Sequence, residues 1–267
     1  MEPMLNIALQ AARSAGDQIV RASDRLDRVK IDIKGQHDYV TEVDWNAERI
    51  IIEQLRKAFP DHTIISEEAG VQTGKDSDCE WIIDPLDGTT NFIRGIPHYA
   101  VSIGFRQKGR LEHAVVYDPM KREEFTASRG KGAYLNEKRI RVSGRVNISG
   151  ALFATGIPFS SDPFKNIEPY LACMKDLAED SSGIRRLGAA SLDLAYVAAG
   201  RYDAFWEMFL KPWDIAAGTL LVREAGGMVS DFQGGDHQLD TGHIVASTPR
   251  LFKTTLSAVG KHLGHLH

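Results

Sequence analysis

The sequence contains little cysteine and no long unbroken run of apolar residues. Its 267 residues include two cysteines, Cys79 and Cys173, which are too few for a disulfide scaffold. The first 20 residues carry Glu2, Arg13 and Asp17 within an apolar pattern, unlike a signal peptide, and no later stretch is long enough to cross a bilayer. These absences predict a reduced, cytoplasmic protein that binds no membrane.

The sequence also lacks an excess of basic residues. Its formal net charge of −4 gives no reason to expect direct DNA binding. The motifs GxGxxG, GxxxxGK[ST], GxSxG and HExxH are absent. Dinucleotide binding, P-loop nucleotide hydrolysis, serine-hydrolase chemistry and zincin chemistry therefore lose most of their support.

Apolar periodicity and turn residues predict the fold class. Short strand-like runs separated by turns between Tyr99 and Arg141 predict an antiparallel meander. The second half alternates strand-like and helical patterns, which predicts helices packed on a mixed sheet. No linker composition separates the halves 1–146 and 147–267, so we predict one catalytic unit, residues 1–267, with a layered α/β (α+β) fold.

The expected elements have the following bounds. A helix near the N-terminus contains Leu5 to Ile19, and a second follows a capping box at Thr41 and Asp44 and ends at Phe59. The expected strands are 63–66, 81–84, 100–105, 114–117, 124–127, 151–155, 204–208, 228–230 and 244–246. The later helices are expected at 163–179, 189–199, 215–225 and 249–262.

Carboxylates stand where several of these elements begin or end. Asp84 closes an apolar run, and Asp87 follows it after Pro85 and Leu86. Proline removes a backbone donor, so the two carboxylates and nearby carbonyls form an oxygen-rich face that suits Mg²⁺. The N–H groups of Gly88 and Thr89 can face a phosphate, while the cations supply the positive charge that this acidic protein lacks.

Each of these features also has an ordinary structural interpretation. Asp84 to Asp87 matches a type I turn, and Glu67 with Glu68 matches a solvated pair after a strand. Asp214 matches the N-cap of the helix expected from Ile215. The residues alone therefore leave both the metal site and the ordinary turn open.

Four sequence elements together resemble the inositol monophosphatase family. Residues 81–92 resemble its first signature at every position, and 213–218 followed by 223–227 resembles the second. Residues 66–68 and 38–44 are similar to its upstream acidic element and early loop. The elements occur in the family's order, and the sequence is most similar to the bacterial members.

The resemblance implies a five-layer αβαβα sandwich, lithium-sensitive Mg²⁺ dependence with two or three ions per site, and a homodimer. The implied metal ligands are Glu67, Asp84, the carbonyl of Leu86, Asp87 and Asp214. Thr89, together with Glu67, would orient the attacking water, and Asp44 would lie near the site or hold a further ion through water. The implied substrate contacts are Gly88, Thr89, Gly188, Ala189, Ala190 and Glu207; without the resemblance, Glu207 is best interpreted as an exposed strand residue.

The function that these residues favour is hydrolysis of inositol monophosphate to inositol and phosphate, with a small phosphorylated polyol as the substrate class. Relatives in the family hydrolyse fructose 1,6-bisphosphate, 3′-phosphoadenosine 5′-phosphate, histidinol phosphate or NADP. A second possibility, from the bacterial members, is a factor in transcription antitermination or ribosome biogenesis that binds the RNA polymerase machinery. The arginines available for such a partner are Arg139, Arg141, Arg145, Arg185 and Arg186.

Overall fold

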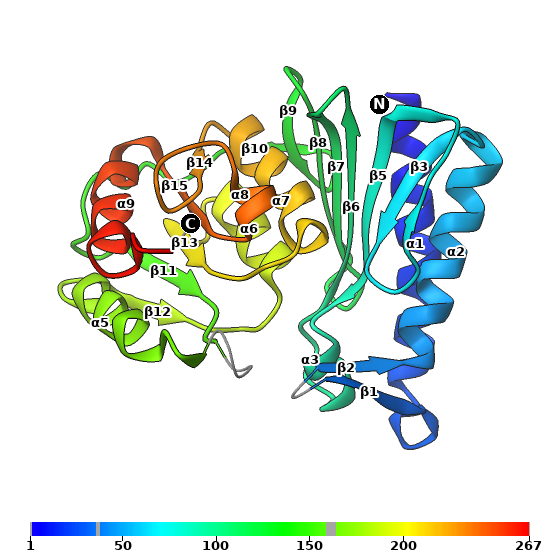
Figure 1. Ribbon diagram of the computed structural model, residues 1–267, viewed down its shortest axis with the longest axis horizontal. Coiled ribbons are helices and arrows are strands. Elements are labelled where there is room, and N and C mark those ends of the chain that lie inside the picture. The colour runs from blue at the N-terminus through cyan, green and yellow to red at the C-terminus, as the bar shows by residue number, and fades with distance from the viewer. Residues whose placement is uncertain (1, 36–37, 159–163, 267) are drawn as a thin grey trace.

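Layers of helices and sheets alternate along the long axis of the molecule in the computed structural model, which describes residues 2–35, 38–158 and 164–266 (Figure 1). Two helices cover the outer face of one sheet, two lie between the sheets, and two cover the outer face of the second sheet. In that order they are α1 (Pro3–Ser23) and α2 (Glu42–Ala58), α6 (Ala190–Ala198) and α7 (Pro212–Glu224), and α5 (Ile167–Ala178) and α9 (Pro249–Leu263). The predicted αβαβα sandwich is confirmed.

The first sheet has eight strands in the order β10-β9-β8-β7-β6-β5-β3-β4. The pairs from β6 to β10 are antiparallel, as the meander predicts. Strand β5 is antiparallel to β6 and parallel to β3. The bounds are β3 (His62–Ser66), β4 (Gly70–Gln72), β5 (Asp76–Asp87), β6 (Ala100–Gln107), β7 (Arg110–Asp118), β8 (Glu123–Ser128), β9 (Gly132–Leu135) and β10 (Lys138–Ile140).

The second sheet has five strands in the order β12-β11-β13-β15-β14. Strands β12, β11 and β13 are parallel, while β15 is antiparallel to both of its neighbours. The prediction of a mixed sheet is therefore confirmed. The bounds are β11 (Leu152–Thr155), β12 (Gly183–Arg185), β13 (Ala204–Glu207), β14 (Met228–Ser230) and β15 (Ile244–Ser247).

Several elements differ from the prediction. The structure adds β1 (Ile31–Gly35), β2 (Asp38–Thr41) and the strands β4, β9, β10 and β12, which were not expected. It also adds the short helices η1 (Leu26–Arg28), α3 (Thr89–Ile93) and α8 (Gln238–Thr241). Helix α5 begins four residues later than expected, and its expected first residue, Pro163, lies outside the described residues. Of the helices described, none combines the length and apolar character that a membrane span requires.

Local hydrogen bonds explain where the two site-bearing helices begin. The capping box of α2 is confirmed, because Thr41 Oγ1 accepts the N–H of Asp44 while Asp44 Oδ2 accepts the N–H of Thr41. The N-cap expected at Asp214 is wrong. Lys211 is the N-cap of α7, Pro212 takes the first helical position, and Asp214 accepts the Lys211 N–H at 2.7 Å.

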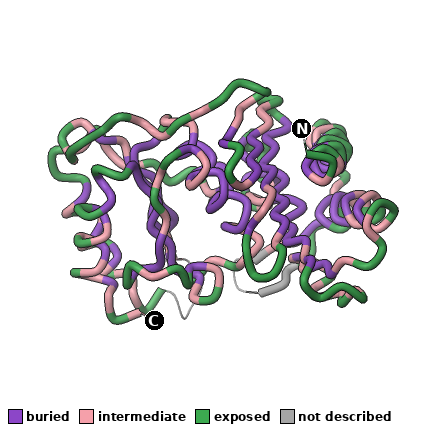
Figure 2. Tube along the Cα trace, turned by 90° about the horizontal axis from the view of Figure 1, so that it is seen from above, coloured by how far each residue is buried: buried purple, intermediate pink, exposed green. Residues whose placement is uncertain are grey.

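The two sheets share one apolar core. Ile82 of the first sheet and Ile244 of the second belong to the same buried cluster as Leu194 of α6 and Leu220 of α7, and Figure 2 shows buried residues along both sheets. A boundary near Val146 stays a prediction.

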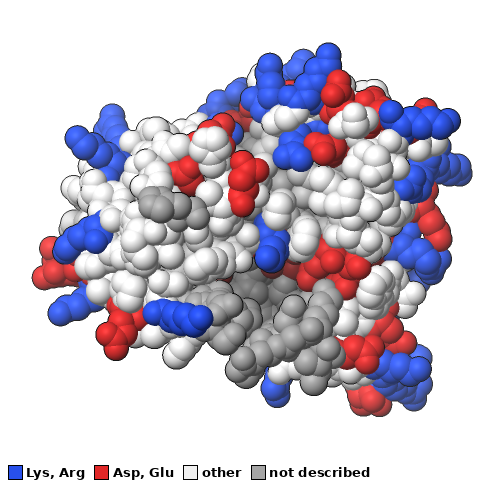
Figure 3. Space-filling model, viewed as in Figure 1, with Lys and Arg blue, Asp and Glu red and all other residues white. Residues whose placement is uncertain are grey.

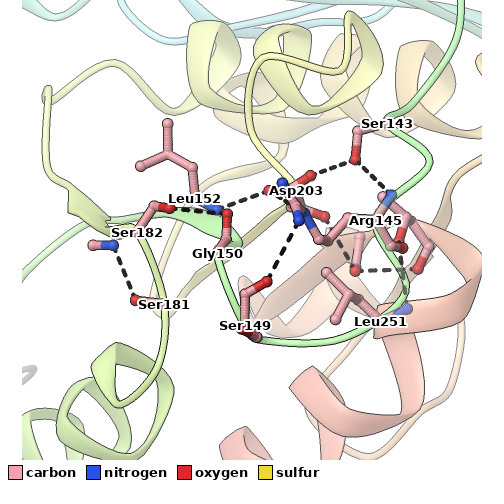
Figure 4. Close-up of polar contacts among 12 residues, drawn as sticks. Ser143, Arg145, Ser149, Gly150, Leu152, Ser181, Ser182, Asp203 and Leu251 are labelled. Carbon is pink, nitrogen blue, oxygen red and sulfur yellow. Dashed lines mark hydrogen bonds and ion pairs between the residues drawn. The ribbon is translucent and has the colours of Figure 1, made fainter.

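Polar contacts hold the segment between β10 and β11 (Figure 4), in addition to the packing of Val142 and Ile148 against the core. Asp203 accepts hydrogen bonds from the Ser143 hydroxyl and from the Leu152 N–H, and the Arg145 N–H bonds back to Ser143. The connection between the halves is therefore ordered, which holds the second sheet in place beside the first.

Candidate active site

The chain leaves β5 through an irregular strand end and not through a plain turn. The register of β5 against β6 shifts between Asp84 and Asp87, and the Leu86 N–H donates to Asp84 Oδ1 at 3.0 Å. Pro85 lies within this shift, where its missing N–H costs no ladder bond. The type I turn interpretation is therefore wrong, and an irregular strand end brings both carboxylates to one edge of the sheet.

The four acidic side chains Glu67, Asp84, Asp87 and Asp214, called the acidic site from here on, influence one another electrostatically. Burial raises the pKa of Asp84 well above its usual range, and the other three carboxylates raise it further. Burial likewise raises the pKa of Asp87 to about 6, and burial and Asp87 raise that of Asp214. Acidic side chains gather beside a hollow on the face shown in Figure 3. Such a concentration of poorly solvated negative charge suits cations.

A separate group of metal-type side chains occurs on β3 and β5. Among the described residues, the three metal-type side chains with ligand atoms all within 4.8 Å of one another are His62, Asp76 and Cys79. They lie at the opposite end of β3 and β5. His62 Nδ1 accepts the Trp81 indole N–H at 3.1 Å, and Cys79 Sγ accepts from Gln107 at 3.4 Å. One ring nitrogen of His62 and the sulfur of Cys79 therefore already accept hydrogen bonds within the protein.

The hydroxyl of Thr89 lies between two oxygen atoms. Its distances are 2.9 Å to Asp44 Oδ1 and 3.0 Å to the Leu86 carbonyl oxygen. Asp44 is buried, which raises its pKa, while hydrogen bonds from Thr41 and Thr89 lower it. The structure therefore joins α2 to the start of α3 through a carboxylate and a hydroxyl, an arrangement that can orient a water molecule and receive its proton.

Glu48 holds the segment that carries Glu67, and sequence reasoning missed it. The Glu48 carboxylate, 2% exposed, accepts the N–H groups of Glu68 at 2.9 Å and Ala69 at 2.8 Å. The Glu67 N–H bonds to the Ile83 carbonyl of β5 at 3.2 Å. Glu48 lies four residues after Asp44, on the same face of α2, and this spacing was the available signal.

The predicted substrate residues lie at the N-terminus of α6 and at the end of β13. Gly188 has φ of +83°, and Ala189 and Ala190 lead directly into α6. Glu207 is partly buried, and a Cβ placed on Gly156 would lie 1.7 Å from its Oε1. The interpretation of Glu207 as an exposed strand residue is therefore wrong.

The electrostatic surroundings of Glu207 connect it to the acidic site. Burial raises the pKa of Glu207 to about 8, with Arg186 lowering it and Asp87 raising it. Glu207 in turn raises the pKa of Asp214. Sequence reasoning missed Asp193, a lone carboxylate in the apolar helix α6. Burial raises the pKa of Asp193, and Glu207 raises it more than any other charged neighbour does. The second half thus brings further carboxyl groups to the site.

Comparison with known proteins decides the family. The model of the inositol monophosphatase family matches residues 1–263. The chain belongs to the inositol monophosphatase family. It is 58% identical over 265 residues to the Nus factor SuhB of Pseudomonas aeruginosa, covering 98% of each chain.

Solved structures of this family have the same fold. The SuhB protein of Bartonella henselae is 42% identical with a TM-score of 0.95, covering 98% of this chain and 100% of that one. An inositol monophosphatase from Anabaena is 34% identical with a TM-score of 0.84, covering 98% and 97%. The expected similarity to bacterial members is confirmed, and membership of an inositol monophosphatase family supports a phosphatase.

Proposed function

We propose that this protein hydrolyses inositol monophosphate to inositol and phosphate in a Mg²⁺-dependent reaction. The observation that carries the proposal is the acidic site, in which Glu67, Asp87 and Asp214 all raise the pKa of the buried Asp84 beside the Thr89–Asp44 pair. A phosphate could not bind beside this charge without cations. Relatives in the family also hydrolyse other phosphomonoesters such as fructose 1,6-bisphosphate, and Glu207 with residues 188–190 favours a phosphorylated polyol among them.

The donor set of the acidic site fits Mg²⁺. Every donor is an oxygen, and mutual repulsion among the carboxylates is the electrostatic condition that a divalent cation relieves. The residues that would hold two or three ions are Glu67, Asp84, Leu86 through its carbonyl, Asp87 and Asp214. When bound, Mg²⁺ neutralises phosphate charge, lowers the pKa of water and stabilises the departing oxygen.

The chain's own groups would orient the reactants. Thr89, with Glu67, would align a water for in-line attack, and Asp44 would accept the proton through the Thr89 hydroxyl to which it is bonded. The new bond joins the water oxygen to phosphorus, and the bond to the inositol oxygen breaks as that oxygen takes a proton from solvent water. The N–H groups of Gly88 and Thr89 would contact the phosphate.

The leaving group would lie on the second half of the chain. Gly188, Ala189, Ala190 and Glu207 would contact inositol hydroxyls. Because these residues come from α6 and β13, while the carboxylates Asp84 and Asp87 come from β5, substrate would bind where the two halves meet.

The decisive assay is phosphate release from inositol 1-phosphate with Mg²⁺, with and without lithium. We expect release that requires Mg²⁺, falls with lithium and drops more than about 100-fold in Asp84→Asn. The matched control is Asp27→Asn, since Asp27 has an 81% exposed side chain. Near-wild-type turnover by Asp84→Asn would contradict the site. Activity on another phosphomonoester alone would keep the reaction and change the substrate.

A second candidate function is a role in transcription antitermination or ribosome biogenesis. The relative at 58% identity carries the name Nus factor SuhB, which favours it. The partners would be RNA polymerase and antitermination factors, and a homodimer and a cytoplasmic location are parts of the same proposal. Binding of the purified protein to RNA polymerase tests it, and binding retained by Asp84→Asn would separate this role from catalysis.

A further inference from the structure

Asn91 connects the loop of the acidic site to the loop of the predicted substrate site. It belongs to the short helix α3, two residues after Thr89, and is 7% exposed. Its side-chain Nδ2 donates to the His98 carbonyl at 2.8 Å and to the Leu187 carbonyl at 2.8 Å, and lies 3.4 Å from the Gly188 carbonyl. Both amide protons are therefore used, one within the first half and one on the second half.

A second bond joins the same two loops from the opposite direction. Asp87 Oδ2 accepts the Ser191 N–H at 2.8 Å and the Ser191 hydroxyl at 2.5 Å. These bonds, together with one from the Ala190 backbone, fix the rotation of the carboxylate. Gly188 thus lies between two residues, Leu187 and Ser191, that are both hydrogen-bonded to the segment 84–91.

A side chain at position 188 would disturb these hydrogen bonds. The φ of +83° at Gly188 favours glycine, and a Cβ there would lie 3.5 Å from Asn91 Nδ2 and 2.8 Å from Arg186 Nη1. Ala189 and Ala190 are buried in the core cluster, so apolar packing holds the second part of the segment. The backbone carbonyls of Leu187 and Gly188 face Asn91 at the first part. Leu187 is 38% exposed and Gly188 has no side chain, so the hydrogen bonds from Asn91 add to the packing at this end of the segment.

We propose that Asn91 is a positioning residue that fixes the loop 187–190 relative to the acidic site, and thereby sets the preference for a polyol leaving group over one without hydroxyls. The inference rests on the proposed function. Asn91 contacts no reacting atom in this scheme. Its loss displaces the surface that receives the inositol ring, while Gly88, Thr89 and Asp44, which would contact phosphate and water, come from the first half of the chain.

The test compares two substrates in Asn91→Ala and in Asn91→Leu, which keeps most of the side-chain volume but has no donor. We expect kcat/KM for inositol 1-phosphate to fall about ten-fold or more, mainly through KM, and that for 4-nitrophenyl phosphate to change less than about three-fold. The control is Asn136→Ala, which removes an exposed asparagine that donates to the Arg122 carbonyl in the meander. Its substrate ratio should equal that of the wild type.

Hydrogen exchange of the metal-free protein supplies a readout that does not depend on activity. Amides in residues 187–192 should exchange at least about five-fold faster in both Asn91 variants, and in Ser191→Ala if an Asn91 variant does not fold. Equal loss on both substrates, or unchanged exchange in 187–192, would overturn the inference while leaving the proposed function intact. A wild type inactive on both substrates would overturn the proposed function, and this inference with it.

Discussion

Glu207→Gln tests whether the substrate side of the site carries a strained carboxyl group. Burial raises the pKa of Glu207 from 4.5 to about 8, so the folded protein binds an extra proton between these pH values. Its contribution to stability is complete below pH 4.5 and is lost as the pH rises through about 8. The shift corresponds to at most about 5 kcal/mol, and because Glu207 keeps some contact with solvent, we expect about 2–3 kcal/mol.

The assay is urea unfolding of wild type and Glu207→Gln at pH 5 and pH 9, with EDTA so that no cation neutralises the site. Glutamine does not titrate, so the variant should gain about 2–3 kcal/mol of unfolding free energy relative to wild type between pH 5 and pH 9. Glu53→Gln is the control, because the Glu53 side chain is 63% exposed. A difference between Glu207→Gln and wild type that is equal at both pH values would refute the reasoning.

Three further predictions follow from the same contacts. Gly156→Ala places a Cβ 1.7 Å from Glu207 Oε1, so we expect a loss of about 1–3 kcal/mol in urea unfolding and at least about ten-fold lower activity on inositol 1-phosphate. His98 is buried and its pKa is lowered to about 4. Its contribution to the free energy of unfolding is therefore present above pH 6.5 and is lost as the pH falls through 4. In urea unfolding, wild type should lose about 3 kcal/mol more than His98→Gln between pH 7 and pH 4. Asp84→Asn removes one of the mutually repelling carboxylates, so the metal-free variant should gain about 1–2 kcal/mol of unfolding free energy in thermal unfolding. Added Mg²⁺ should no longer stabilise the variant. A Mg²⁺-induced gain in stability equal to that of wild type would contradict the site.

Local signals predicted the parts of the fold that local physics determines. The capping box at Thr41 and the alternating strands of the meander depend on residues within a few positions of one another, so the sequence pattern predicted them. The parallel pairing of β3 with β5 was not predicted, because the pairing partner of a strand depends on the whole sheet. Asp214 was placed at the wrong helical position because Pro212 begins the helix earlier than its apolar pattern.

The acidic residues of the site could be named from the sequence, but their bonding partners could not. Asn91 and Leu187 are separated by 96 positions, and Asp87 and Ser191 by 104. No periodicity relates residues at such distances, and an asparagine after two threonines is an unremarkable sequence feature. The type I turn interpretation failed for the same reason: pairing with β6 outweighs the local turn preference of Asp84-Pro85.

The site residues come from both halves of the chain, so both halves have to be folded before the site exists. Asp84, Asp87 and Thr89 lie on β5 and α3, but Asp87 is oriented by Ser191 of α6, and Asp214 comes from α7. The two helices lie between the sheets and share one core with both of them. A displacement of one sheet relative to the other therefore moves the carboxylates relative to the leaving-group surface. The common core resists such movement, so it keeps the carboxylates at fixed positions relative to one another.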